Sequence, residues 1–334
     1  MLAITPILII CFIQLSNSFL APVQNQITRR AYGIPIMALK TLSPRKELFF
    51  EIVASGLLDR FPDQKDIPRI VKFCQYAKSE ISIPSSTKYL HEPIEEYIDN
   101  LRAHPWWNPS EFSWVEELEK NSEIINNELK SVLDTEKQLF KGDSRYQSTM
   151  GKGWTAFRLQ RLGEWNENNI KKFPCTTKLI QSINIPLAVR GVMFAKQAPS
   201  TYVQSHSDGR NFILTAHLGL DIPPSGCWIE VGGKRKEWEQ NKVIIFDTSF
   251  SHETGNESSQ NRYVLIIDFW HPDLTLLEQK ALEFIYDSRN KFESGRVNEI
   301  DCSWVKEGKP LDVESYLKSK SDFGNVFNMF GWGK

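Results

Sequence analysis

The sequence predicts a mainly β protein whose core is a double-stranded β-helix, or jelly roll, with flanking α-helices. Between about residues 191 and 272, short runs rich in Val, Ile, Leu and Phe are separated by turn signals such as Pro223-Pro224 and Gly232-Gly233. Many short strands with frequent turns are typical of a jelly roll. Apolar residues three and four apart indicate helices on both sides of this block. The runs expected as strands are 191–197, 211–222, Cys227–Val231, 242–247 and Arg262–Trp270.

The N-terminal residues 1–46 differ from the rest of the chain. Residues 2–15 are almost entirely apolar, too short to span a bilayer comfortably, and are followed by a small-x-small cleavage pattern at residues 16–18. Residues 19–46 contain basic but no acidic side chains. We therefore expect a signal peptide over 1–18 and a transit-like presequence over 19–46. This arrangement is similar to the bipartite plastid-targeting presequences of diatoms and related algae, in which a Phe follows the cleavage site, as Phe19 does. A plain secretory signal is the alternative.

Three further regions are expected after the presequence. Residues 47–150 form a helical region, because 47–53 and 115–140 show helical periodicity. Residues 151–275 form the jelly-roll domain. Residues 276–334 form a C-terminal helical extension that begins with a helix over 277–286.

Composition excludes several classes of protein. The net charge is −1, from 40 basic and 41 acidic side chains, so nothing supports a nucleic-acid or anionic-membrane partner. The five cysteines are scattered without a Cys-x-x-Cys pair, which argues against a disulfide-stapled secreted fold. We therefore expect no nucleic-acid partner, and we expect no membrane span in the mature chain. The sequence leaves the oligomeric state open.

Two histidines and one aspartate in the strand-rich block form a candidate metal site. His206 and Asp208 are two residues apart, which on an extended segment places both side chains on one side, and His252 follows the run 242–247. Two imidazoles and one carboxylate are the facial triad of non-haem Fe(II) oxygenases, which leaves coordination positions open for a 2-oxo acid and O₂. A His-x-Asp pair alone is a weak signal, and structural histidines near strand ends are common. The added His252 strengthens the metal interpretation.

Arg262 is a candidate anion site at the start of the last expected strand. It lies ten residues after His252. A guanidinium binds a carboxylate through two parallel hydrogen bonds, so it suits the distal carboxylate of 2-oxoglutarate. The competing interpretation is a surface arginine at a strand edge.

Several motifs of the chain resemble the aspartyl/asparaginyl β-hydroxylase-like family of Fe(II)- and 2-oxoglutarate-dependent dioxygenases. These motifs are 206–223, Gly226-Cys227, Trp238-Glu239, 242–253 and 268–275, and weaker matches extend upstream through Trp154 and 173–177 to Trp106-Trp107. The resemblance implies a cupin-like jelly roll that uses Fe(II), 2-oxoglutarate and O₂, with ascorbate as reductant in vitro. It also implies that His206 and His252 hold the iron, that Arg262 binds the distal carboxylate, and that His217 approaches the other end of 2-oxoglutarate.

Other residues of these motifs are better explained by structure. For His217 the alternative is an ordinary core histidine. Asp247 and Glu253 are expected to shape the strand end and orient His252, and Trp270 and His271 are expected to pack.

The chain departs from the family pattern at four positions. Asp208 replaces the glycine of the animal hydroxylases, which restores a third ligand. Thr215 and Ala195 replace an arginine and a serine that help hold 2-oxoglutarate, and Ile213 replaces an arginine that contacts substrate. Another cation is therefore expected to assist cosubstrate binding, and Arg190, Arg210 and Lys196 are the candidates.

The expected activity is oxidation of an unactivated C–H bond of a small, carboxylate-bearing metabolite. A diatom-type presequence on a member of this family suggests one substrate, an N-prenylated glutamate that is oxidatively cyclised in domoic acid (kainoid) biosynthesis. The alternatives are aspartyl/asparaginyl hydroxylation of a peptide or protein and a catalytically inactive cupin-like binding module. The four residues His206, Asp208, His252 and Arg262 are all present, which argues against the inactive module.

Overall fold

The computed structural model describes residues 43–93, 96–140, 150–151 and 153–306. The expected signal peptide lies outside these residues, as do all but the last four residues of the expected presequence. Part of the C-terminal extension, residues 307–334, also lies outside them.

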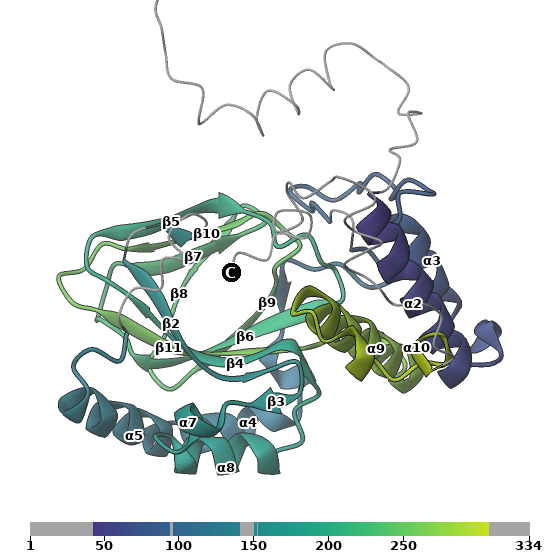
Figure 1. Ribbon diagram of the computed structural model, residues 1–334. Helices are drawn as coiled ribbons and strands as arrows, with labels where there is room; N and C mark the ends of the chain where they lie inside the picture. Colours follow the sequence, from purple (N-terminus) through teal and green to yellow (C-terminus); the bar gives the residue numbers. More distant parts are fainter. Residues whose placement is uncertain (1–42, 94–95, 141–149, 152, 307–334) are drawn as a thin grey trace, which may run out of the picture. The chain divides into compact units, whose positions relative to one another are not determined.

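Two antiparallel sheets form the centre of the fold. The larger sheet has the strand order β1 (Trp106–Trp107), β9 (Val243–Asp247), β6 (Ile213–Asp221), β11 (Arg262–Trp270), β4 (Leu187–Gln197), β2 (Trp154–Arg161) and β3 (Glu164–Trp165). The smaller sheet has the order β5 (Thr201–His206), β10 (His252–Asn256), β7 (Cys227–Val231) and β8 (Lys234–Glu237). Figure 1 shows the two sheets facing each other. The predicted jelly roll with flanking helices is confirmed.

Side chains from both sheets fill the space between them. Met193, Ala195 and Val264 of the larger sheet share one buried cluster with Val203 and Ile229 of the smaller sheet. The neighbouring positions of the larger sheet point the other way and form a second cluster beneath a layer of helices. This layer consists of α4 (Trp114–Lys120), α5 (Ser122–Thr135), α7 (Glu167–Ile170) and α8 (Pro174–Ser182). Because the central strands are buried on both faces, they read as nearly continuous apolar runs.

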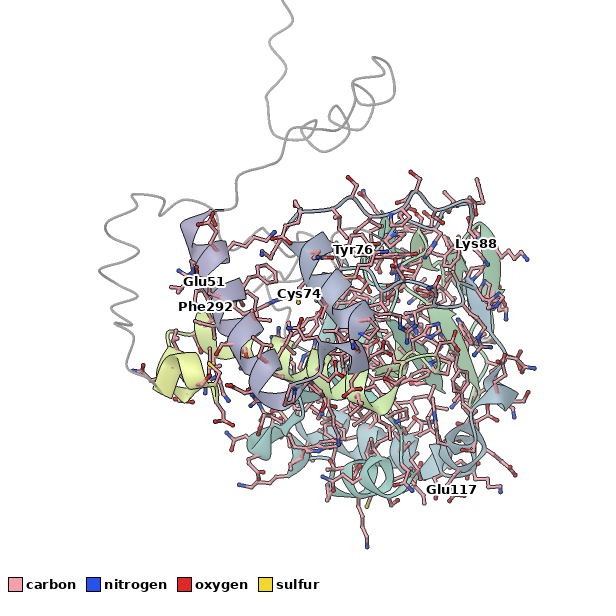
Figure 2. The ribbon with its side chains drawn as sticks, turned by 90° about the vertical axis from the view of Figure 1, so that its right-hand side faces the viewer. Glu51, Cys74, Tyr76, Lys88, Glu117 and Phe292 are labelled. Carbon is pink, nitrogen blue, oxygen red and sulfur yellow. The ribbon has the colours of Figure 1, made fainter. Side chains whose placement is uncertain are left out.

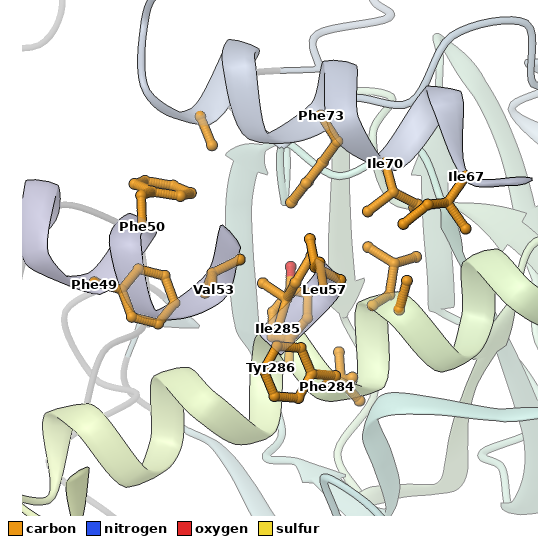
Figure 3. Packing of buried hydrophobic residues seen from close by; sticks show 14 of the residues in the cluster. Phe49, Phe50, Val53, Leu57, Ile67, Ile70, Phe73, Phe284, Ile285 and Tyr286 are labelled. Carbon is orange, nitrogen blue, oxygen red and sulfur yellow. The ribbon is translucent and has the colours of Figure 1, made fainter. Parts of the chain in front are cut away.

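A second group of helices packs beside the sheets. It contains α2 (Pro44–Arg60), α3 (Pro68–Ala77), α9 (Leu276–Glu293) and the short α10 (Ser303–Lys306). Val53, Ile70 and Ile285, one from each of α2, α3 and α9, are buried in their common core (Figure 3). Figure 2 views this side of the molecule, with Cys74 and Tyr76 on α3 and Phe292 on α9.

The structure differs from the expected element pattern in three places. Among the described residues of 81–113, within the expected helical region, the regular elements are a short 3₁₀ helix (Pro109–Glu111) and β1, which pairs with β9. The helix expected over 277–286 continues to Glu293 as α9. Pro44, Arg45 and Lys46, expected in the presequence, form the first turn of α2, which Ser43 caps. Among the described helices, none combines the length and apolar character needed to cross a membrane.

Candidate metal centre

His206 and His252 lie directly opposite each other on the paired strands β5 and β10. Their ring centroids are 4.3 Å apart. The Nδ1–H of His206 donates to the Gln204 carbonyl at 2.8 Å, and that of His252 donates to the Phe250 carbonyl at 2.9 Å. Each of these hydrogen bonds fixes the tautomer and leaves the Nε2 lone pair available for a metal. The Nε2 of His206 is buried and has no hydrogen-bond partner among the described residues.

Asp208 completes a three-residue cluster. One ligand atom each from His206, Asp208 and His252 lie within 4.8 Å of one another. Asp208 follows the end of β5, so the two-residue alternation of a strand is not what places it beside His206. Instead, its backbone N–H donates to the Thr248 carbonyl at 2.9 Å, and its carboxylate pairs with Arg190. The turn after β5 thus brings the carboxylate to the two imidazoles.

The charges of this cluster suit a divalent cation. Burial favours the neutral form of Asp208, but Arg190 and the two histidines outweigh it and hold the pKa of the carboxyl well below its usual range. Burial, with His206 close by, lowers the pKa of His252 to about 4. At neutral pH the cluster therefore offers a carboxylate and a neutral imidazole, both of which can donate an electron pair to a metal.

Arg262 is a buried guanidinium with no carboxylate partner among the described residues. Its side chain begins β11, is 1% exposed, and stacks on the Trp238 ring with 4.1 Å between the guanidinium carbon and the ring centroid. No described residue accepts a hydrogen bond from its Nε or Nη1. Burial lowers the pKa of Arg262 to about 10, which is still high enough to keep it charged. Because an uncompensated buried charge is costly, this residue indicates a site built for an anion.

His217 lies beside Arg262 on the inner face of the larger sheet. Its ring is parallel to Trp238, with 5.9 Å between centroids, and meets Phe246 edge-on. Burial, together with the Arg262 charge, lowers the pKa of His217 well below its usual value, so the imidazole is neutral. Its Nδ1 has no described partner. A satisfied core histidine would have one, so the open atom favours a ligand-facing role.

Trp238 contacts both candidate cosubstrate residues, although it was expected only as part of a family motif and without a role of its own. It lies between β8 and β9, contacts both Arg262 and His217, and is 4% exposed. The available signal was a lone tryptophan in an otherwise polar stretch. A cavity of about 630 Å³ borders Trp238, and its other lining residues include Trp107, Ile222 and Ile244. None of the three metal-ligand candidates lines this cavity.

The three candidates for a second cation that assists cosubstrate binding have different environments in the structure. Arg190 reaches the site and contacts Asp208 and Thr215. Arg210 pairs with the buried Glu96 instead. Lys196 lies on β4 next to the inward-facing Ala195, so strand alternation turns it to the opposite face.

The remaining motif residues have structural environments. Asp247 is fully buried, accepts hydrogen bonds from the backbone N–H and hydroxyl of Ser249, and has its pKa raised by burial to about 7. It thereby shapes the turn that precedes His252. Trp270 belongs to the core beside α9, and His271 packs edge-on against Trp107. Ile213 is fully buried in the same core as Trp270, so it does not face a substrate.

The sequence of this region matches a known protein family. Residues 119–272 match the sequence model of the family described as Aspartyl/Asparaginyl beta-hydroxylase, and this segment contains all five candidate site residues. Residues 119–272 are thus similar to the aspartyl/asparaginyl β-hydroxylase family. We call this segment the β-hydroxylase-like domain.

Curated relatives differ in their names and in how much of them the chain covers. Human aspartyl/asparaginyl beta-hydroxylase is 36% identical over 193 residues, which cover 56% of this chain and 25% of that protein. Ornithine lipid ester-linked acyl 2-hydroxylase of Rhizobium tropici is 31% identical over 174 residues, which cover 50% and 61%. The chain thus spans about a quarter of the human relative and about three fifths of the bacterial one.

Solved structures give weaker similarity. A prolyl-4-hydroxylase from Pseudomonas putida covers 45% of this chain and 86% of its own, at 12% identity and a TM-score of 0.31. The fold is therefore established by the strand order of the two sheets.

Proposed function

We propose that the β-hydroxylase-like domain is an Fe(II)- and 2-oxoglutarate-dependent oxygenase, with His206, Asp208 and His252 as the metal ligands. The observation that carries the proposal is the convergence of these three ligand atoms, all within 4.8 Å of one another. Two imidazoles and one carboxylate fit Fe(II) and leave positions open for cosubstrate and O₂. When bound, the iron would couple oxidative decarboxylation of 2-oxoglutarate to oxidation of a substrate C–H bond.

The protein would bind and orient the cosubstrate. Arg262 would donate to its distal carboxylate, which supplies the acceptor that Nε and Nη1 lack. Trp238 holds the guanidinium in place through its ring face. Neutral His217 would contact the other end of the cosubstrate without adding charge beside the metal.

Metal binding and cosubstrate turnover test this proposal together. Purified protein should bind Fe(II) anaerobically and release succinate when 2-oxoglutarate, O₂ and ascorbate are supplied. His206→Ala and His252→Ala should abolish both, and Asp208→Gly should lower turnover at least ~100-fold, the scale usual for disturbed metal sites. The exposed His104 offers a matched control, since His104→Ala removes an imidazole elsewhere. Unchanged turnover in His206→Ala would disprove the assignment, and metal binding without succinate release would support the inactive binding module.

We further propose a small, carboxylate-bearing metabolite as the substrate. Support comes from the resemblance, which implies a substrate-contacting arginine in the animal enzymes where this chain has the fully buried Ile213 and so lacks that polar contact. The name of the Rhizobium tropici relative also describes a lipid acyl group rather than a protein as substrate. Oxidative cyclisation of an N-prenylated glutamate, the domoic acid hypothesis, is one form of this proposal. Hydroxylation of an aspartyl or asparaginyl residue in a peptide is the alternative, named for the human relative.

A competition between substrate classes tests this second part. The protein is incubated with Fe(II), 2-oxoglutarate and either N-prenylated glutamates or Asp- and Asn-containing peptides, and the products are identified by mass spectrometry. Loss of two hydrogens from the small substrate indicates cyclisation or desaturation, and gain of one oxygen indicates hydroxylation. Turnover of peptides alone would disprove the small-metabolite proposal.

A further inference from the structure

Arg190 reaches the candidate metal centre although strand alternation predicts otherwise. Along β4, Val192 and Phe194 belong to the cluster beneath the helices, whereas Met193 and Ala195 face the smaller sheet. An even-numbered residue at position 190 would therefore point toward the helices. Its side chain nevertheless contacts Asp208, beside the two histidines.

A bulge at Gly191 explains this change of direction. Gly191 has a φ of +74°, and a Cβ added there would lie 2.0 Å from the Gln160 side-chain oxygen and 2.2 Å from its carbonyl oxygen. Against β11, the pairing of β4 shifts register between Val192 and Leu187, a span that contains Gly191 and places five residue steps of β4 opposite two of β11. An odd number of extra residues, here three, reverses the face that side chains occupy on the two sides of the bulge. Glycine suits this position because it adopts a positive φ freely.

The guanidinium of Arg190 contacts segments that are far apart in the sequence. Besides the ion pair of Nη1 with Asp208, the Nη2 of Arg190 lies 2.9 Å from Asp268, 3.0 Å from the Thr215 hydroxyl and 3.3 Å from the Thr248 hydroxyl. Thr215 also donates to Asp268 at 2.6 Å. Both Nη atoms of Arg190 are therefore committed to carboxylates.

We infer that Arg190 is a positioning residue for Asp208, and that it is not the second cation of the cosubstrate pocket. It would hold one carboxylate oxygen of Asp208 so that the other faces the two Nε2 atoms. Its single positive charge between Asp208 and Asp268 leaves one negative charge, which favours a divalent cation nearby. This inference rests on the proposed metal site.

A double-mutant cycle tests the positioning role. Co(II) is used as the probe, and its dissociation constant and visible absorption bands are measured for the wild type, Arg190→Met, Asp208→Gly and the double variant. Arg190→Met should weaken Co(II) binding ~10–100-fold and alter the bands, because the carboxylate ligand is no longer held. In the Asp208→Gly background the same change should have little further effect, because the residue through which Arg190 acts is absent.

Two additional variants distinguish a specific effect on Co(II) binding from a general loss of stability. Arg190→Lys keeps the positive charge but loses the planar fork, so an intermediate loss of Co(II) affinity is expected. Arg69→Met is the matched control, since Arg69 makes a comparable hydrogen-bonded pair with the buried Glu278 far from the metal centre. It should lower stability while leaving Co(II) binding and the bands unchanged.

The outcomes separate this inference from the proposal on which it rests. Effects of the two substitutions that simply add would overturn the positioning role, as would unchanged Co(II) affinity in Arg190→Met. A loss of 2-oxoglutarate affinity with Co(II) affinity unchanged would instead assign Arg190 to the cosubstrate. A wild-type protein that fails to bind Co(II) would overturn the proposed metal site as well as the inference.

Discussion

At the scale of single residues, Arg262 is the main candidate for binding the cosubstrate. Its guanidinium is buried, stacked on Trp238 and left without an acceptor at Nε and Nη1. If it binds the distal carboxylate of 2-oxoglutarate, Arg262→Lys should raise the cosubstrate KM and Arg262→Ala should raise it more. The loss for Ala is expected to be about 2–5 kcal/mol, as for other buried charge-assisted pairs. Steady-state kinetics should show little change in the KM of the prime substrate.

The same residue gives a second, independent prediction on stability. Arg262→Met removes a buried charge whose Nε and Nη1 have no acceptor among the described residues, so the protein without cosubstrate should become more stable by about 1–3 kcal/mol. Thermal unfolding without cosubstrate measures this change. A lower Tm for the variant would mean that Arg262 stabilises the fold itself and would weaken its assignment as an anion site.

His271 predicts how stability depends on pH. Its Nε2–H donates to the Arg102 carbonyl, its Nδ1 accepts from the Asp273 backbone N–H, and burial lowers its pKa from 6.5 to about 4. Between these two values the unfolded chain binds more protons than the folded one, so stability falls as the pH drops from about 6.5 to 4. The full loss is roughly 3 kcal/mol. Denaturant unfolding at several pH values should show a smaller pH dependence for His271→Asn than for the wild type.

At the scale of elements, α9 begins with a complete capping box. The Thr275 side chain accepts from the Glu278 N–H, and the Glu278 carboxylate accepts from the Thr275 N–H. Thr275→Ala should cost about 1 kcal/mol and lower the Tm by roughly 2–4 °C, whereas Thr275→Ser should retain most of the stability. Equal effects of the two substitutions would show that the hydroxyl does not contribute.

The elements also show what could be predicted from the sequence. The apolar strands β4, β6, β7, β9 and β11 were all expected, because burial on both faces leaves a long hydrophobic run. The strands β5 and β10, which carry the two candidate histidines, were not expected, because their sequences are mostly polar. The five candidate site residues could be named from motifs. The contact of Arg190 could not, because it depends on one bulge that reverses the direction of a side chain.

At the scale of the whole molecule, the folded chain begins before the point at which the presequence was expected to end. Lys46, expected at the end of the presequence, is 7% exposed in α2, and Arg45 stacks on Phe292. We propose that residues 1–18 are removed and that a plastid-targeting segment ends by residue 42. Residues 1–42 fused to a fluorescent reporter should reach the plastid of a diatom as efficiently as residues 1–46. Secretion of the reporter would support the plain signal peptide instead.

The two sheets contribute different parts of the candidate site. His206 and His252 come from the smaller sheet, whereas Arg262, His217 and Arg190 come from the larger one. A metal bound to the smaller sheet and chelated by 2-oxoglutarate that is bound to the larger sheet would cross-link the two sheets. Neither the iron nor 2-oxoglutarate alone would form this cross-link. Iron and cosubstrate added together should therefore protect the backbone amides of β5 and β10 from hydrogen exchange more than the sum of their separate effects.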